Sequence, residues 1–357
     1  MAMPPLIIPF FIPHAGCPHH CLFCNQQTIS GTWQPLPDTA QIREQVADWL
    51  KRSPDRPTEV AFFGGSFTLL PRQTQEVLLD AVQPFIRQGL VQGIRISTRP
   101  DGLEAETLVF LQGLQVKTIE IGVQSLDDTV LQQAGRGHTA EQSLQALVRV
   151  RAAGFSTGAQ LLPGLPGDSP EKAVTSLRGV MAAGAQFVRI YPAVVLQGTG
   201  LAALYLAGQY QPLNLLQGVA MAARMLDAAN KAGIPVIRIG LQADDGLTTP
   251  GVLLAGCWHP ALGQMVRSQL FRDLVCQMTR ELPAGTAITL HCHPQQLSEV
   301  VGQRRANLSA WDRAGLSVRQ VLPDQQLERY QLCLEYFQHK IRCSVITNHI
   351  YEEFQHA

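Results

Sequence analysis

The sequence predicts an α/β fold, a parallel (β/α)6-type partial barrel followed by a C-terminal α/β extension. Short apolar runs rich in β-branched residues recur along residues 7–195, and a segment of helical character lies between most consecutive runs. Glycine or proline stands at most of the helix ends. This alternation is typical of βα units, which build parallel sheets.

The elements follow one another in order along the chain. The predicted strands are residues 7–12, 59–63, 94–98, 118–123, 157–162 and 187–195, and the predicted helices are residues 38–51, 72–87, 103–111, 140–153 and 170–183. Beyond them we expect a helix over residues 213–232, strands over 236–241 and 287–291, and a last helix over 325–338. Residues 1–242 are therefore expected to form the barrel core, and residues 243–357 an extension that covers its open side.

Composition describes an ordinary globular chain. Hydrophobic residues make up 46% of the 357 positions, and the 28 Lys and Arg balance the 28 Asp and Glu, so the net charge supplies no global attraction for nucleic acid or acidic lipid. Residues 1–12 are apolar but contain three prolines and no basic segment, and we find no uncharged apolar run long enough to span a membrane. The expected location is the cytoplasm, with no membrane partner.

Three of the eight cysteines lie within eight residues, as Cys17, Cys21 and Cys24 with the spacing C-x3-C-x2-C. They directly follow the first predicted strand, and parallel barrels carry their chemistry at the carboxyl ends of the strands. A [4Fe–4S] cluster usually takes four thiolates. Three local cysteines would leave one iron open to bind another molecule.

Structural zinc is the main alternative for these cysteines, because His14, His19 and His20 lie nearby and could supply a fourth ligand. Structural zinc sites usually combine two separated C-x2-C pairs, and no second pair occurs here. A non-catalytic iron–sulfur or zinc protein, used for structure or for electron transfer, would need a fourth protein ligand.

With Phe23 before the third cysteine, the motif C-x3-C-x-aromatic-C resembles that of the radical S-adenosylmethionine (radical SAM) superfamily. The resemblance implies that Cys17, Cys21 and Cys24 bind a [4Fe–4S] cluster and that S-adenosylmethionine chelates the open iron. It implies reductive cleavage of S-adenosylmethionine to a 5′-deoxyadenosyl radical, which abstracts hydrogen, with an electron donor such as flavodoxin or ferredoxin. Phe23 would lie near the adenine.

Further motifs follow the later strands. Gly64, Gly65 and Ser66 resemble the paired-glycine motif of the superfamily, which would face the methionine moiety, although a glycine pair alone indicates only a turn. A period of two places Glu120 and Gln124 on one face of the fourth strand, and it places Ser97 on a polar face of the third. Polar faces on adjacent strands favour a binding cavity.

Residues 135–139 and 160–167 resemble a narrower group, which contains anaerobic coproporphyrinogen dehydrogenase and the catalytic subunit of the tRNA-modifying elongator complex. The resemblance implies that Gln124, Arg136 and Gln160 contact S-adenosylmethionine. Ser97 and Gln160 stand where the porphyrinogen enzyme has acidic residues. The chain is most similar to elongator-like proteins, in a compact form without an acetyltransferase domain. A porphyrinogen dehydrogenase-like enzyme is the alternative.

The substrate is expected to be an RNA nucleoside, by this resemblance, or a small anion. The second possibility rests on four arginines that strand periodicity directs into the barrel lumen, namely Arg95, Arg99, Arg189 and Arg238. Converging arginines suit a carboxylate or phosphate. These arginines could equally be paired with Glu59, Glu120 and neighbouring backbone groups. The run His291-Cys292-His293 is expected to have a structural role, because alternation separates the histidines from the cysteine.

Overall fold

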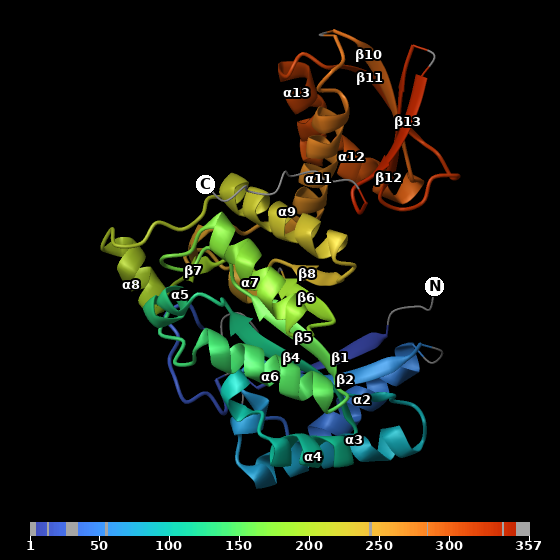
Figure 1. The fold of residues 1–357 in the computed structure, drawn as a ribbon. Coiled ribbons are helices and arrows are strands. Elements are labelled where there is room, and N and C mark those ends of the chain that lie inside the picture. Colours follow the sequence, from blue (N-terminus) through green and yellow to red (C-terminus); the bar gives the residue numbers. More distant parts are fainter. Residues whose placement is uncertain are drawn as a thin grey trace.

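The structure is a computed structural model that describes residues 5–12, 14–25, 35–53, 56–242, 245–283, 285–337 and 339–347. Seven parallel strands form one curled sheet in the order β1-β2-β3-β4-β5-β6-β8 (Figure 1). Their bounds are β1 (Leu6–Phe11), β2 (Thr58–Phe63), β3 (Gly93–Thr98), β4 (Val116–Gln124), β5 (Ser156–Leu161), β6 (Phe187–Ile190) and β8 (Val236–Ile239). The predicted α/β partial barrel is confirmed, with the strand expected near residue 236 as its seventh member.

Helices cover the outer face of this sheet (Figure 1). They are α2 (Thr39–Arg52), α3 (Arg72–Arg87), α4 (Ala105–Gly113), α6 (Ala140–Ala152), α7 (Pro170–Ala182) and α9 (Leu215–Lys231). The short helix α5 (Asp128–Gln133) follows β4, and the short helical turns η1 (Phe67–Leu69) and η2 (Pro100–Gly102) follow β2 and β3. Alternate strand residues such as Val60, Ile96 and Ile119 are fully buried in the core. The opposite face of each strand is left to line the lumen.

The predicted strand 187–195 is wrong in one respect, because it divides into β6 and β7 (Val194–Leu196). Pro192 lies between them and has no N–H to donate to a neighbouring strand. After the break, β7 pairs antiparallel with β9 (Leu253–Gly256), outside the main sheet. In the sequence the short helix α8 (Gly200–Leu206) follows β7, and the short helix α10 (Asp245–Thr248) precedes β9.

The C-terminal region has its own mixed sheet, in the order β11-β10-β12-β13. Its elements are α11 (Leu262–Met278), β10 (Ala287–Cys292), η3 (Pro294–Gln296), α12 (Leu297–Val301), η4 (Gln303–Arg305), α13 (Ala306–Arg313), β11 (Ser317–Pro323), β12 (Gln331–Tyr336) and β13 (His339–Ser344). The predicted helix 325–338 is wrong. Leu332 and Leu334 are buried in β12, which pairs antiparallel with both β10 and β13, and this distant pairing outweighs local helical propensity.

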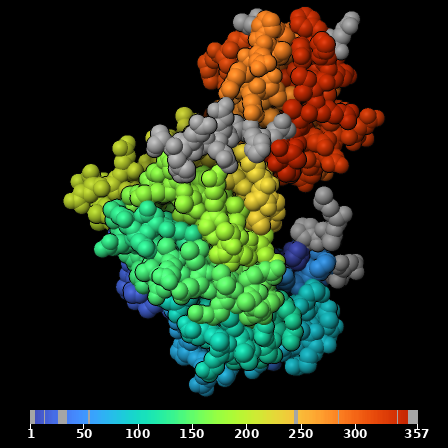
Figure 2. Space-filling model, in the orientation of Figure 1, coloured from blue at the N-terminus to red at the C-terminus, as the bar shows by residue number. Residues whose placement is uncertain are grey.

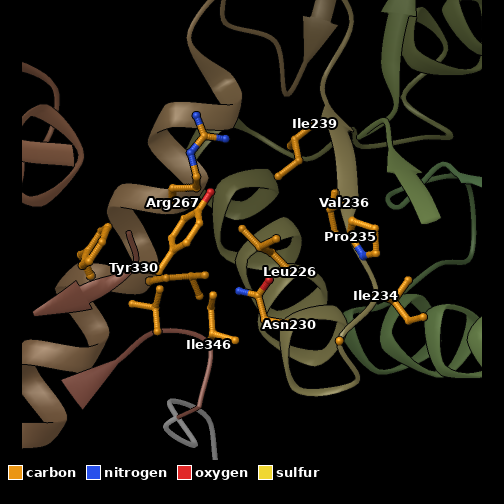
Figure 3. Close-up of a pocket in the computed structure, with 13 residues that line it drawn as sticks. Leu226, Asn230, Ile234, Pro235, Val236, Ile239, Arg267, Tyr330 and Ile346 are labelled. Atoms are coloured by element: carbon orange, nitrogen blue, oxygen red, sulfur yellow. The ribbon is translucent and has the colours of Figure 1, made fainter. Parts of the chain in front are cut away.

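Helix α11 joins the two parts by packing against α9 and β8. In the space-filling view the C-terminal residues form a lobe beside the body of the molecule (Figure 2). A cavity of about 490 Å³ lies where the parts meet, between α9, β8 and α11, and its lining includes Leu226, Asn230, Arg267 and Tyr330 (Figure 3). None of the lining residues belongs to the cysteine loop. Within the described ranges, no helix combines the length and apolarity needed to cross a membrane.

Candidate functional site

The cysteine loop follows β1 at the carboxyl edge of the sheet, as expected. Cys17, Cys21 and Cys24 form no disulfide among the described residues, and each is partly exposed. Tight turns shape the loop, because the Cys17 N–H donates to the His14 carbonyl at 3.2 Å and the Cys24 N–H donates to the Cys21 carbonyl at 3.1 Å. All three sulfurs thus lie on one short segment.

The paired glycines lie directly against this loop. Gly65 has φ of +54°, and a Cβ there would stand 2.3 Å from the carbonyl oxygen of Ala15. The Ser66 N–H donates to the same carbonyl at 2.8 Å, while the Ser66 hydroxyl bonds to Thr98 Oγ1 at 2.9 Å. Residues 64–66 therefore connect the cysteine loop to the end of β3. Only glycine fits the close approach at position 65.

Arg136 links the cysteine loop to β4. Its Nη1 donates to the Cys21 sulfur at 3.4 Å, and its Nη2 donates to the Gly122 carbonyl at 2.6 Å. Gln124 lies next to it at an irregularity in the β4–β5 pairing, with φ of +71°. Arg136 Nε and Gln124 Oε1 are buried and have no hydrogen-bond partner in the described part of the chain. Buried polar atoms without partners are rare in proteins, so both atoms are candidates for ligand contact.

Phe23 is partly buried on another side of the loop. It packs against two small apolar clusters, one containing Val130 and Leu165 and the other Val195 and Leu201. Leu22 anchors the same stretch, because the Leu201 N–H donates to its carbonyl at 2.7 Å. These contacts hold the third cysteine between α5 and α8.

A second group of residues, Ser97, Glu120 and Gln160, lies within β3, β4 and β5, apart from the cysteine loop that follows β1. Glu120 is fully buried and accepts from Arg95 Nη1 at 2.8 Å, Arg189 Nη2 at 2.9 Å and Gln160 Nε2 at 3.1 Å. Gln160 Nε2 also lies 3.4 Å from Ser97 Oγ. The expected cofactor residues are thus divided between the cysteine loop and an ion-paired layer inside the lumen.

We expected four lumen arginines to be available to bind an anion, and this is wrong for three of them, because each pairs with a carboxylate of the protein. Arg95 pairs with Glu59 at 2.9 Å and with Glu120, and Arg189 pairs with Glu120 at 2.7 Å. Burial lowers the pKa of Arg189, but the charges of Glu120 and Tyr191 and the hydrogen bonds to both together outweigh it, and the net pKa is raised. Glu59 and Glu120 neutralise the guanidinium groups of Arg95 and Arg189. Ion pairing is the alternative that the sequence left open for these arginines.

The third arginine forms a pair that sequence reasoning missed. Arg99 is almost completely buried and pairs with Asp101 at 2.8 Å, directly after β3. Burial raises the pKa of the Cys17 thiol, and the opposing charges of Arg136 and Arg99 offset only part of that rise. The signal available in the sequence was the run Arg99-Pro-Asp101-Gly, in which a proline turn brings opposite charges together.

His138 belongs to the motif of residues 135–139, but the sequence assigned it no role of its own. Burial and the charge of Arg136 lower its pKa to about 3. Its Nδ1 lies 3.2 Å from the Ser143 hydroxyl, and its Nε2 is buried with no hydrogen-bond partner within the described ranges. The imidazole is therefore neutral near pH 7 and stands among the charges of Arg136, Arg99 and Asp101.

The donor set suits a cluster with an open iron. Across the ranges that the structure describes, no three His, Cys, Asp or Glu side chains already stand together as a metal site. The three thiols nevertheless share one loop, and Arg136 donates a hydrogen bond to one of them. Arg136 Nε and Gln124 Oε1 are buried without partners in the described part of the chain. Thiolate ligands are the usual donors of iron–sulfur clusters, and nearby N–H groups tune them.

Two protein families and several known proteins are similar to this chain. Residues 11–178 match the family described as the radical SAM superfamily, and residues 185–272 match the one described as the radical SAM C-terminal domain. Elongator complex protein 3 of Saccharomyces cerevisiae is 27% identical over 223 residues, which cover 57% of this chain and 40% of that protein. The tRNA uridine(34) acetyltransferase of Methanocaldococcus infernus is 29% identical over 238 residues, covering 56% of this chain and 45% of that protein.

The match spans less than half of the length of either relative. A solved structure of the archaeal Methanocaldococcus infernus Elp3 has a TM-score of 0.57 and 17% identity, and it covers 94% of this chain and 75% of that chain. That likeness concerns the fold. With the two family matches spanning most of residues 11–272, this chain is an enzyme of the radical SAM superfamily, whose members bind a [4Fe–4S] cluster and S-adenosylmethionine.

Proposed function

We propose that Cys17, Cys21 and Cys24 hold the [4Fe–4S] cluster and that the neighbouring residues orient S-adenosylmethionine over it. When bound, the pair supplies a 5′-deoxyadenosyl radical for hydrogen abstraction. Arg136 donates to the Cys21 sulfur and to the Gly122 carbonyl at the same time, and its Nε is buried with no hydrogen-bond partner within the described residues. In this proposal Arg136 Nε and Gln124 Oε1 bind S-adenosylmethionine, and Gly64, Gly65 and Ser66 shape the loop beneath it.

One observation carries this proposal. Arg136 reaches a cysteine of the loop, and the two unpartnered atoms beside that contact are buried. Leaving such groups unsatisfied costs about 1–3 kcal/mol each, a cost that a polar ligand would remove. Ser97, Glu120 and Gln160 are assigned a supporting role below this site, since they bond to one another and to Arg95 and Arg189.

For the substrate we propose an RNA nucleoside, with a small anion as the second candidate. The support is the similarity to a protein named as a tRNA uridine(34) acetyltransferase, of which this chain matches 45%. In this proposal residues 1–242 form the partial barrel that carries the radical reaction, and residues 243–357 form an extension that helps to enclose the open side of the barrel. A flavodoxin or ferredoxin in the cytoplasm would supply the electron.

Anaerobic reconstitution with iron and sulfide tests this function. The protein should show the electron paramagnetic resonance (EPR) signal of a reduced [4Fe–4S] cluster, S-adenosylmethionine should change that signal, and 5′-deoxyadenosine should form. Single Cys17→Ala, Cys21→Ala and Cys24→Ala variants should lose the cluster, whereas Cys276→Ala, at an exposed thiol of α11, should keep it. A signal that S-adenosylmethionine leaves unchanged, without 5′-deoxyadenosine, would favour an electron carrier. Stoichiometric zinc in anaerobically purified protein would favour a structural metal site.

A further inference from the structure

Arg238 differs from the other lumen arginines in its charge balance. Arg95, Arg99 and Arg189 each pair with a carboxylate. Arg238, in contrast, forms no ion pair among the residues that the structure describes, and its hydrogen bond is to the backbone carbonyl of Gly240 at 3.0 Å. It is half-buried, so its positive charge is only partly screened by water.

The position of Arg238 directs this charge into the lumen. In the β6–β8 pairing, Arg238 lies opposite Arg189, whose side chain reaches Glu120 inside the lumen. Tyr191 is two residues beyond Arg189, and its hydroxyl lies 3.1 Å from Arg189 Nη1. Burial raises the pKa of Tyr191, and the charges of Arg189 and Arg238 oppose that rise.

The guanidinium of Arg238 is held in one orientation by its own turn. Gly240 has φ of +77°, and its N–H donates to the Ile190 carbonyl at 2.9 Å, which fixes the turn against β6. The Gly240 carbonyl then accepts from Arg238 Nε. With Nε occupied, Nη1 and Nη2 are left as a pair of donors, the arrangement that binds two oxygens of one carboxylate or phosphate.

We propose that Arg238 is the anion-binding residue of the substrate site and receives an oxyanion of the substrate, a phosphate or a carboxylate, at the carboxyl edge of β8. This inference deepens the proposed function and rests on it, because it assumes that the substrate enters the lumen. A substrate oxyanion would balance the one lumen arginine that lacks a carboxylate partner in the described structure.

The experiment measures anion preference by calorimetry on the full-length, cluster-loaded protein. Two probe pairs distinguish the two oxyanions: uridine 5′-monophosphate against uridine, and succinate against its neutral diamide. The wild-type protein should bind at least one anion about 10- to 100-fold more tightly than its neutral counterpart, the range for a charge-assisted hydrogen-bonded pair. Arg238→Gln should bring that ratio close to one, and Arg238→Lys should keep part of it.

Arg319→Gln is the matched control, because Arg319 is an exposed arginine on β11 and its loss makes the same change in net charge. Its anion preference should equal that of the wild type. The inference is overturned if the wild type prefers neither anion, or if both Arg238 variants keep the full preference. If Arg238→Gln does not fold, the inference is tested instead by whether Arg238→Lys loses part of the anion preference. Cleavage of S-adenosylmethionine by the wild type without substrate tests the proposed function separately.

Discussion

Arg136 Nη1 donates a hydrogen bond to the Cys21 sulfur at 3.4 Å, while Nη2 of the same side chain donates to the Gly122 carbonyl at 2.6 Å. One guanidinium therefore connects the cysteine loop after β1 to the centre of the sheet in β4. N–H donors stabilise negative charge on a thiolate, and hydrogen bonds to sulfur are among the factors that set the potential of an iron–sulfur cluster.

Removing this donor should make the cluster harder to reduce. In Arg136→Gln the charge and the reach to the Cys21 sulfur are lost, so we expect a more negative midpoint potential in an EPR-monitored redox titration. Arg149→Gln, which removes a guanidinium from α6 that contacts Leu103 and Glu104, is the control and should titrate as the wild type does. An unchanged potential in Arg136→Gln would exclude this role for the Arg136–Cys21 contact.

Gly65→Ala should destabilise the cysteine loop far more than an ordinary glycine substitution. A Cβ at position 65 would stand 2.3 Å from the Ala15 carbonyl oxygen and 2.5 Å from that of Ile12, and neither backbone group can move without the loop. Gly89→Ala is the matched control, since Gly89 also has positive φ but has open space around it. We expect a loss of about 1–2 kcal/mol for Gly89→Ala from backbone strain and a larger loss for Gly65→Ala. Urea unfolding and iron content after reconstitution measure both, and equal losses would contradict the tight packing.

The sequence predicted most strands of the barrel, but it did not resolve the lumen ion pairs or predict strand β12. Strands β1 to β5 could be predicted because buried parallel strands are short and apolar, and because glycine and cysteine motifs mark their carboxyl ends. The pairing of Arg189 with Glu120 could not be resolved, because it depends on which side chains meet across the lumen. The pairing of Arg99 with Asp101 is local to one turn, and the sequence carried a signal for it that was missed. Strand β12 was missed because the partners that define it, β10 and β13, are set by tertiary structure.

Glu120→Gln should cost stability, because Glu120 is the shared partner of Arg95 and Arg189 inside the lumen. Removing one member of a buried ion pair costs about 3–5 kcal/mol, since the remaining charges stay buried with less compensation. The exposed pair of Lys51 and Asp48 provides the comparison, and Asp48→Asn should cost no more than about 1 kcal/mol. Urea-unfolding midpoints measure both variants. Losses of similar size would mean that water reaches Glu120.

His138 should make the protein less stable as the pH falls below about 6.5. Its pKa is lowered to about 3 in the folded chain, mainly by burial and by Arg136, whereas the unfolded chain has the model-peptide value of 6.5. Between these two values the unfolded state binds the extra proton, so stability is complete above pH 6.5 and falls with decreasing pH by up to about 1.4 kcal/mol per unit.

From pH 7.5 to 5.5 this single group should remove about 1.4 kcal/mol from the free energy of unfolding. His138→Gln should lack that part of the pH dependence. Ser143→Ala, which removes the hydroxyl beside Nδ1 but keeps the imidazole, should retain it. Urea titrations of the three proteins at both pH values give the comparison. If His138→Gln and the wild type lose the same free energy over this interval, the imidazole is already accessible to protons in the folded protein.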